Sequence, residues 1–266
     1  MASRIFYERV YRIEEDFEKI SEELYDLEFS NFYSLENDEG KFLILVSDKP
    51  EELKYLEEKL TFSKEFVEQR KTNSEDWIKN IITKPFEYIK GVYVDPDHHD
   101  NINAEHVIRI VPGLAFGTGL HVTTKLAGEM LRKYLKPGME VLDLGCGSGI
   151  LSILAKKLGA SKVLGVDNDK IAVEVARENV KLNNVENVEI RESNLLRNVT
   201  GKFDLIVSNI LAEILIEALK DIKNYLKEDG IVILSGIIDS KLHLFENLNV
   251  IEHRRKAEWN SLVIKP

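Results

Sequence analysis

The pattern best suited to binding a ligand in this sequence is a set of three glycines at every second position, which lie between two aspartates. Asp143 is followed by Gly145, Gly147 and Gly149, and Asp167 comes 24 residues after Asp143. Glycine has no Cβ, so a backbone with this spacing can turn sharply and let a ligand lie directly against it. A helix that begins at such a turn directs its free N–H groups at the ligand. A carboxylate at this distance along a strand–helix–strand unit can accept hydrogen bonds from ribose hydroxyls, so the pattern predicts a nucleoside-containing cofactor.

A second group of candidates lies before and after the glycines. The segment Pro112–Thr124 holds three glycines and three threonines among its thirteen residues, and it is rich in backbone N–H and hydroxyl donors. One interpretation is a lid over the cofactor, with a threonine at the charged end of the ligand. The other is a loop in which Thr123 or Thr124 caps the following helix. His121 is a weak candidate for a general base. Asn209 follows an apolar strand, at the end where ligands bind in open α/β sheets.

Alternating strands and helices must position these residues. The predicted strands are short and apolar, whereas the segments between them have apolar residues at helical spacing. Five strand–helix units followed by a closing hairpin predict a mostly parallel sheet with one reversed strand. Strands are expected at Val141–Leu144, Lys162–Val166, Val188–Arg191, Phe203–Val207, Gly230–Leu234, Asn249–Glu252 and Asn260–Ile264, and helices at Leu126–Leu135, Ile150–Leu158, Lys170–Asn183 and Ile214–Leu226.

The first part of the chain predicts a smaller, separate domain. Its order, β-α-β-β-α-β, is typical of a ferredoxin-like α+β module. Four strands are expected at Arg4–Arg12, Phe29–Leu35, Lys41–Ser47 and Thr61–Gln69, with helices at Ile13–Leu27 and after Pro50. We therefore expect a ferredoxin-like domain at 1–70, a helical linker at 71–85 and an α/β domain at 86–266. Phe86–Val94 and His106–Val111 are predicted to be the first strands of the last domain.

Charge and composition narrow the class of protein. The net charge is −10, and residues 1–95 carry 14 Lys/Arg against 23 Asp/Glu, which places −9 of that charge in the front part. An acidic front part disfavours nucleic acid as a partner and suits a basic protein. The other interpretation is a solvated surface that only keeps the protein in solution. The longest apolar runs are too short to span a bilayer, and the N-terminus has no apolar leader, so we expect a cytoplasmic protein without membrane contact.

Two features invite interpretations that their context disfavours. Cys146 is the one cysteine of the chain, so it can form no internal disulfide, and a small residue that fits the glycine turn explains it better than a reactive thiol. His98 and His99 are adjacent and flanked by aspartates, but no third ligand has a suitable spacing, so no metal site is expected.

The motifs resemble those of one family of enzymes. A nicotinamide-binding turn needs its third glycine at Ile150, whereas G-x-G-x-G after Asp143 is similar to motif I of class I S-adenosylmethionine-dependent methyltransferases. Within that class, the chain resembles the methyltransferases of the eleventh protein of the large ribosomal subunit (L11). The matching stretches are P-G-L-A-F-G-T-G-x-H-x-T-T at Pro112–Thr124, D-x-G-C-G-S-G-I-L at Asp143–Leu151, Gly165–Asp169, N-I-L-A at Asn209–Ala212 and L-S-G-I at Leu234–Ile237.

The resemblance implies a fold, a reaction and roles for particular residues. It implies an α/β fold, a Rossmann-like seven-stranded class I methyltransferase domain preceded by the small ferredoxin-like domain, which selects the substrate. S-adenosylmethionine would donate methyl groups to amino groups of L11, on lysine side chains and, as a further candidate, the N-terminal amine. The residues implied to bind the cofactor are Thr124, Gly145, Asp167 and Asn209, to which the motif adds Gly147 and Asp143; no metal is implied.

Other functions stay open at this point. The enzyme could methylate a different protein or a small-molecule amine, and a non-catalytic module that only binds S-adenosylmethionine is a further alternative. A nucleobase or glutamine-amide methyltransferase would carry two prolines and an aromatic residue after the fourth strand, where this chain has Asn209-Ile210-Leu211. A non-catalytic module would be expected to have lost parts of motif I, which is intact here.

Overall fold

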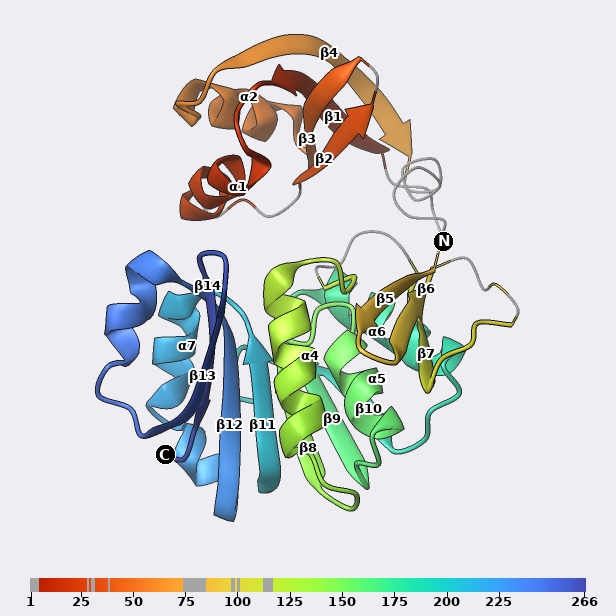
Figure 1. Cartoon of the computed structure of the whole chain (residues 1–266), viewed down its shortest axis with the longest axis vertical. Helices are drawn as coiled ribbons and strands as arrows, with labels where there is room; N and C mark the ends of the chain where they lie inside the picture. Colours follow the sequence, from red (N-terminus) through yellow and green to blue (C-terminus); the bar gives the residue numbers. More distant parts are fainter. Residues whose placement is uncertain are drawn as a thin grey trace. The chain divides into compact units, whose positions relative to one another are not determined.

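The chain folds into two compact units, Met1–Ile82 and Thr83–Pro266, which are described separately here. The structure is a computed structural model, and it describes residues 5–27, 29, 32–37, 39–73, 85–96, 99, 101–111 and 117–266 (Figure 1).

The first unit is a four-stranded antiparallel sheet with two helices. Strand order is β2-β3-β1-β4, and buried Tyr11, Leu43 and Leu45 of the sheet pack against Leu24 and Leu53 of the helices. The β-α-β-β-α-β order expected from the sequence is present. The elements are β1 (Ile5–Ile13), α1 (Phe17–Asp26), β2 (Phe32–Asn37), β3 (Gly40–Ser47), α2 (Pro50–Lys59) and β4 (Lys64–Asn73).

The fourth strand of this unit runs further than the sequence predicts. Lys71, Thr72 and Asn73, which we assigned to a helical linker, belong to β4 and pair with residues Tyr7 to Ile5 of β1. Charged and polar residues are tolerated there because β4 is an edge strand and largely exposed. The rest of the expected linker, residues 74–84, lies outside the described residues.

The second unit begins with a small three-stranded sheet. The apolar run Phe86–Val94, expected to be one strand, is two strands, β5 (Phe86–Ile89) and β6 (Val92–Asp95). A turn at Gly91, which has a φ of +77°, separates them, and the alternation of apolar residues continues on both sides of it. The parallel partner of β6 is β7 (His106–Arg109).

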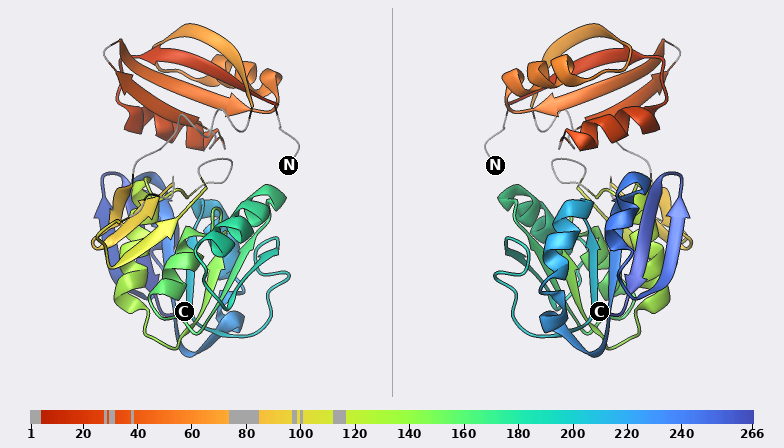
Figure 2. Two further views of the ribbon diagram at one scale, coloured as in Figure 1. Left: turned by 90° about the vertical axis from the view of Figure 1, so that its right-hand side faces the viewer. Right: turned by 90° about the vertical axis from the view of Figure 1, so that its left-hand side faces the viewer.

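The main body of the second unit is a seven-stranded sheet with helices on both faces (Figures 1 and 2). Strand order is β10-β9-β8-β11-β12-β14-β13, and β14 alone runs against its neighbours, which confirms the predicted sheet with one reversed strand. Its strands are β8 (Glu140–Leu144), β9 (Lys162–Asp167), β10 (Val188–Glu192), β11 (Phe203–Asn209), β12 (Leu226–Ile238), β13 (Val250–Lys256) and β14 (Trp259–Ile264). The helices are α4 (Val122–Tyr134), α5 (Ile150–Lys157), α6 (Lys170–Leu182) and α7 (Ala212–Leu219), with 3₁₀ turns at Ile222–Tyr225 and Asp239–Phe245.

Successive residues of the strands point to opposite faces of the sheet, where they form two separate hydrophobic cores. Val141 and Val207 pack with α4, α5 and the small sheet, whereas Leu142, Ile206 and Leu234 pack with α7 and the 3₁₀ turns. Because both faces are buried, the carboxyl ends of the strands are the natural place for a ligand. The helix expected at Ile214–Leu226 is shorter, since α7 ends at Leu219 and Leu226 already belongs to β12.

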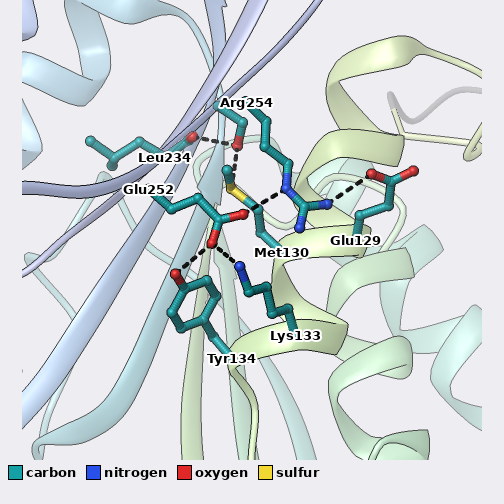
Figure 3. Close-up of polar contacts among 8 residues, drawn as sticks. Glu129, Met130, Lys133, Tyr134, Leu234, Glu252 and Arg254 are labelled. Atoms are coloured by element: carbon teal, nitrogen blue, oxygen red, sulfur yellow. Dashed lines mark hydrogen bonds and ion pairs between the residues drawn. The ribbon is translucent and has the colours of Figure 1, made fainter.

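Helix α4 is held on both of its sides. The hydroxyl of buried Tyr88, on β5, donates to the carbonyl of Thr124 (2.7 Å). The same hydroxyl oxygen would lie 2.3 Å from a Cβ at position 128, so only glycine fits there. On the opposite side, the Glu252 carboxylate of β13 accepts from Tyr134 (2.6 Å) and pairs with Lys133 and Arg254 (Figure 3). These contacts fix the helix that carries Thr124. No helix in the described part of the chain is long and apolar enough to cross a membrane.

Candidate functional site

Residues 145–149, the glycine turn, follow β8 and fold over the end of the neighbouring strand β9. The N–H groups of Gly145 and Cys146 both donate to the carbonyl of Val166 on β9, at 2.8 and 3.0 Å. Gly145 has a φ of +76°, and a Cβ there would lie 2.3 Å from a methyl carbon of Ile210. Glycine is therefore required at this position by the fold itself, before any ligand is considered.

Asp167, at the end of β9, is oriented by two backbone amides. Its Oδ2 accepts from the N–H of Gly147 (2.8 Å), and its Oδ1 accepts from the N–H of Asp169 (3.0 Å). Each carboxylate oxygen can accept more than one hydrogen bond, so both keep capacity for a ligand donor. The geometry suits two adjacent hydroxyl groups, as a ribose presents.

A pocket of about 220 Å³ opens at the carboxyl ends of these strands. It is smaller than the roughly 300–1,000 Å³ of sites that enclose a whole drug-sized ligand, so it suits one part of a cofactor. Asp167 and Asn194 provide polar edges, and aliphatic side chains provide the walls, as a nucleoside requires. The lining residues are Leu144, Gly145, Val166, Asp167, Asn168, Ser193, Asn194, Leu195, Ile210, Ile214 and Glu217.

Thr124 and Asn209 are hydrogen-bonded to each other, and neither residue lines this pocket. The amide nitrogen of Asn209 donates to the hydroxyl of Thr124 at 3.2 Å, which joins the start of α4 to the end of β11. The Oδ1 of Asn209 is buried and has no hydrogen-bond partner among the described residues. A buried acceptor without a donor is costly, so this atom fits a donor group of a ligand. Asn209 precedes Ile210, a wall of the pocket, so one ligand can reach both places.

Asp143 lies beneath the glycine turn and does not line the pocket. Its side chain is fully buried, and its Oδ2 accepts from the hydroxyl of Ser152 at 2.6 Å. Burial raises the pKa of this carboxyl to about 7. Gly147 also does not line the pocket, and its described contact is the hydrogen bond to Asp167. Asp143 therefore supports the turn from the protein interior, and partly exposed Gly147 holds the Asp167 carboxylate.

His121 caps helix α4, whereas one of the two interpretations of the sequence gave this role to Thr123 or Thr124. Its ring nitrogen Nδ1 accepts from the N–H of Thr123 (3.3 Å) and lies 2.8 Å from the hydroxyl of the same residue, and the ring packs edge-on against Trp259. Burial lowers the pKa of His121 to about 4. So weak a base, already engaged as a cap, is a poor acceptor for the proton of a lysine ammonium. The first part of the expected lid, residues 112–116, lies outside the described residues.

The structure adds residues that sequence reasoning missed and bears on two features that the sequence left doubtful. Asn194 and Leu195 follow β10 at the same sheet edge, so the argument that singled out Asn209 would have found them had it been applied to that strand. Cys146 is buried, and burial raises its pKa well above the usual value, which disfavours a reactive thiol. His98, one of the two adjacent histidines, lies outside the described residues. Among the residues that the structure describes, no group of three or more His, Cys, Asp or Glu could hold a metal ion.

Comparisons with known proteins agree on one family. A family model described as "Ribosomal protein L11 methyltransferase (PrmA)" matches residues 8–266. A protein of Thermosipho melanesiensis named ribosomal protein L11 methyltransferase is 66% identical over 266 residues and covers 98% of both chains. One of the same name from Thermotoga neapolitana is 43% identical over 274 residues, with the same coverage.

A solved structure gives the same result. The crystal structure of ribosomal protein L11 methylase from Lactobacillus delbrueckii subsp. bulgaricus matches with a TM-score of 0.64 and 36% identity, over 68% of this chain and 97% of that one. The sequence relatives cover almost the whole length of the chain. The chain therefore belongs to the ribosomal protein L11 methyltransferase family.

Proposed function

We propose that this protein transfers methyl groups from S-adenosylmethionine to amino groups of ribosomal protein L11 in the cytoplasm. The observation that carries the proposal is the pocket at the strand ends, with Asp167 held by two backbone amides at its polar edge. Lysine side chains are the main acceptors in this proposal, and the N-terminal amine is a further one. Relatives that bear the corresponding name support the choice of substrate.

The residues of the site divide the binding of the cofactor between them. In the proposal, Asp167 accepts the ribose hydroxyls, Gly145 lets the ligand approach the backbone, and the aliphatic walls enclose the base. The buried Oδ1 of Asn209 accepts a donor from the amino-acid end, and Thr124 holds the Asn209 side chain in place. Asp143 supports the turn from the protein interior, and Gly147 holds the Asp167 carboxylate.

Methyl transfer itself requires little acid–base chemistry from the protein. The sulfonium of the cofactor supplies an activated methyl group, so the protein must mainly align the acceptor and exclude water. The acceptor needs a free lone pair, and an apolar approach lowers the pKa of a lysine ammonium. Ile210 and partly exposed Leu211, directly after Asn209, offer such surroundings. His121 keeps its place as a helix cap and takes no proton.

The first unit is proposed to select the protein substrate. The excess of acidic residues in the front part of the chain would attract a lysine-rich partner, and this attraction should weaken with salt. Raising the salt from about 50 to about 300 mM should raise the KM for L11 several-fold and leave the dissociation constant of the cofactor almost unchanged. Equal salt effects on both constants would count against recognition through charge.

The main test uses the full chain, methyl-labelled S-adenosylmethionine and a ribosomal-protein extract. The label should enter a band that mass spectrometry identifies as L11. Label in another protein would support the alternative of a different substrate, and cofactor binding without any transfer would support a non-catalytic module.

A pair of variants tests the site directly. Asp167→Ala should weaken cofactor binding by about tenfold or more in calorimetric titration, because hydrogen bonds to a charged acceptor contribute roughly 1.5–3 kcal/mol each. Glu192→Gln is the matched control, since Glu192 is an exposed carboxylate on the neighbouring strand, in register with Asp167 and outside the pocket. Unchanged affinity in Asp167→Ala would contradict the assignment of the pocket.

A further inference from the structure

Two asparagines, one in the last turn of helix α6 and one directly after it, hold the end of β7 and the residues that follow it. The side-chain amide of Asn183 accepts from the N–H of Arg109 (2.9 Å) and donates to its carbonyl (2.6 Å), as a neighbouring strand would. One turn earlier, the Oδ1 of Asn179 accepts from the N–H of Val111 at 2.8 Å. The pair therefore fixes the chain up to Val111, the last described residue before position 117.

Asn179 also reaches the glycine turn, which Asn183 does not. Its Nδ2 donates to the carbonyl of Ser148 at 2.8 Å, and the hydroxyl of Ser148 donates to the carbonyl of Gly117 at 2.7 Å. The connected groups run from Val111 through Asn179 and Ser148 to Gly117. Val111 and Gly117 are the described residues on either side of positions 112–116, and each is hydrogen-bonded to one side chain of the pair Asn179 and Ser148.

The pair is buried and closely fitted. Asn179 is fully buried and Ser148 is 1% exposed, so their polar groups depend on these hydrogen bonds. A Cβ on Gly117 would lie 3.3 Å from the Ser148 hydroxyl, and Gly117 has a φ of +95°. Neither side chain lines the pocket. From Gly117 the chain continues to Thr124, whose hydroxyl meets Asn209.

We propose that Ser148 and Asn179 are positioning residues for methyl transfer. They hold residues 117–124 against the glycine turn. Binding of the cofactor at the turn therefore also fixes Thr124 and Asn209, on the side of the site where we expect the acceptor to enter. The inference rests on the proposed function, because it assigns these residues to the same site. A hydroxyl and an amide suit this task, since each joins two backbone segments that no strand pairing connects.

The test compares three variants of the full chain. Ser148→Ala and Asn179→Ala break the connection. Asn183→Ala is the matched control, because it removes two hydrogen bonds to Arg109 and one to the backbone carbonyl of Asn179, and it leaves the side-chain bonds of Asn179 and Ser148 in place. We expect kcat with L11 to fall about tenfold or more in the first two variants, since small misplacements of reacting groups are costly. The dissociation constant of S-adenosylmethionine should change less than threefold, and Asn183→Ala should keep kcat within about twofold.

Hydrogen exchange gives a readout that does not depend on activity. In the wild type, binding of S-adenosylhomocysteine should slow exchange in two peptides, one that covers residues 117–124 and one that covers residues 145–149. In Ser148→Ala, binding should slow exchange only in the peptide that covers residues 145–149. If Asn179→Ala fails to fold, Ser148→Ala alone decides, since loss of one hydroxyl leaves the packing of α6 intact.

The outcomes separate this inference from the proposed function. If the wild type transfers no methyl group, the proposed function fails, while the exchange experiment still tests the connection. If the wild type is active and Ser148→Ala keeps its kcat and its exchange response in 117–124, the positioning role is wrong. A parallel loss of kcat in all three variants would show a structural role only.

Discussion

The buried carboxyl of Asp143 should make the stability of the second unit depend on pH. Burial raises its pKa from 3.8 to about 7, so the folded state holds the proton more tightly than the unfolded state does. The folded state therefore bears no penalty below about pH 4, a growing penalty between pH 4 and 7, and the full penalty above pH 7. At about 1.36 kcal/mol for each pKa unit, the full penalty is on the order of 4 kcal/mol.

The variant Asp143→Asn removes this ionisation while keeping the shape of the side chain. For a domain of this size, 1 kcal/mol shifts the melting temperature by roughly 2–4 °C. We therefore expect the melting temperature of the variant, relative to the wild type, to rise by about 10 °C as the pH is raised from 4 to 8. Any cost of the new amide adds an offset that does not depend on pH.

Differential scanning calorimetry of both proteins from pH 4 to 8 checks this prediction. Ser152→Ala provides a second arm, because the Ser152 hydroxyl donates to Asp143 and lowers its pKa. Without that donor, the pKa of Asp143 in the folded state rises further, so the loss of stability should still begin near pH 4 but continue to a higher pH and become larger. A difference between Asp143→Asn and the wild type that stays constant from pH 4 to 8 would refute the reasoning.

Three further predictions concern residues around the site and the edge of the sheet. Gly145→Ala should abolish cofactor binding and lower the melting temperature, because the added Cβ would lie 2.3 Å from Ile210 in a left-handed conformation; a binding titration checks this. Glu252→Gln should cost about 1–3 kcal/mol at pH 7, since its partners lower the pKa of Glu252 to about 2, and the loss should vanish as the pH falls from 4.5 through 2, as acid-unfolding curves would show. Cys146 should resist iodoacetamide in the native protein and react after denaturation, which mass spectrometry detects.

Most of the catalytic fold could be predicted because its strands are short apolar runs with turn residues between them. The apolar run Val141–Leu144 lies in β8 and Lys162–Val166 lies in β9. The reversed strand near the C-terminus follows from a hairpin that has to pair beside a parallel sheet. The division at Gly91 was missed, since the apolar alternation of β5 continues into β6 and a single glycine does not always mark a turn.

The site was predictable in part. Asp167 and Gly145 stood out because backbone geometry and ligand chemistry both restrict the residue at each position. Asn179 did not stand out, because a polar residue in an amphipathic helix ordinarily faces solvent, and only the fold brings Val111, beyond the end of β7, against it. His121 was considered for catalysis, whereas its burial and its contact with Thr123 make it a cap.

The contact between Tyr88 and Gly128 has a consequence for the building of chimaeras between members of the family. Helix α4 has an opening at Gly128 that the ring of Tyr88 fills, and the hydroxyl of the ring reaches the carbonyl of Thr124. If α4 were transplanted from a relative with a larger residue in place of Gly128, the helix and the small sheet would collide. The small sheet and α4 should therefore be exchanged between relatives together, as one unit. A larger residue at position 128 should be accompanied by a smaller one at position 88.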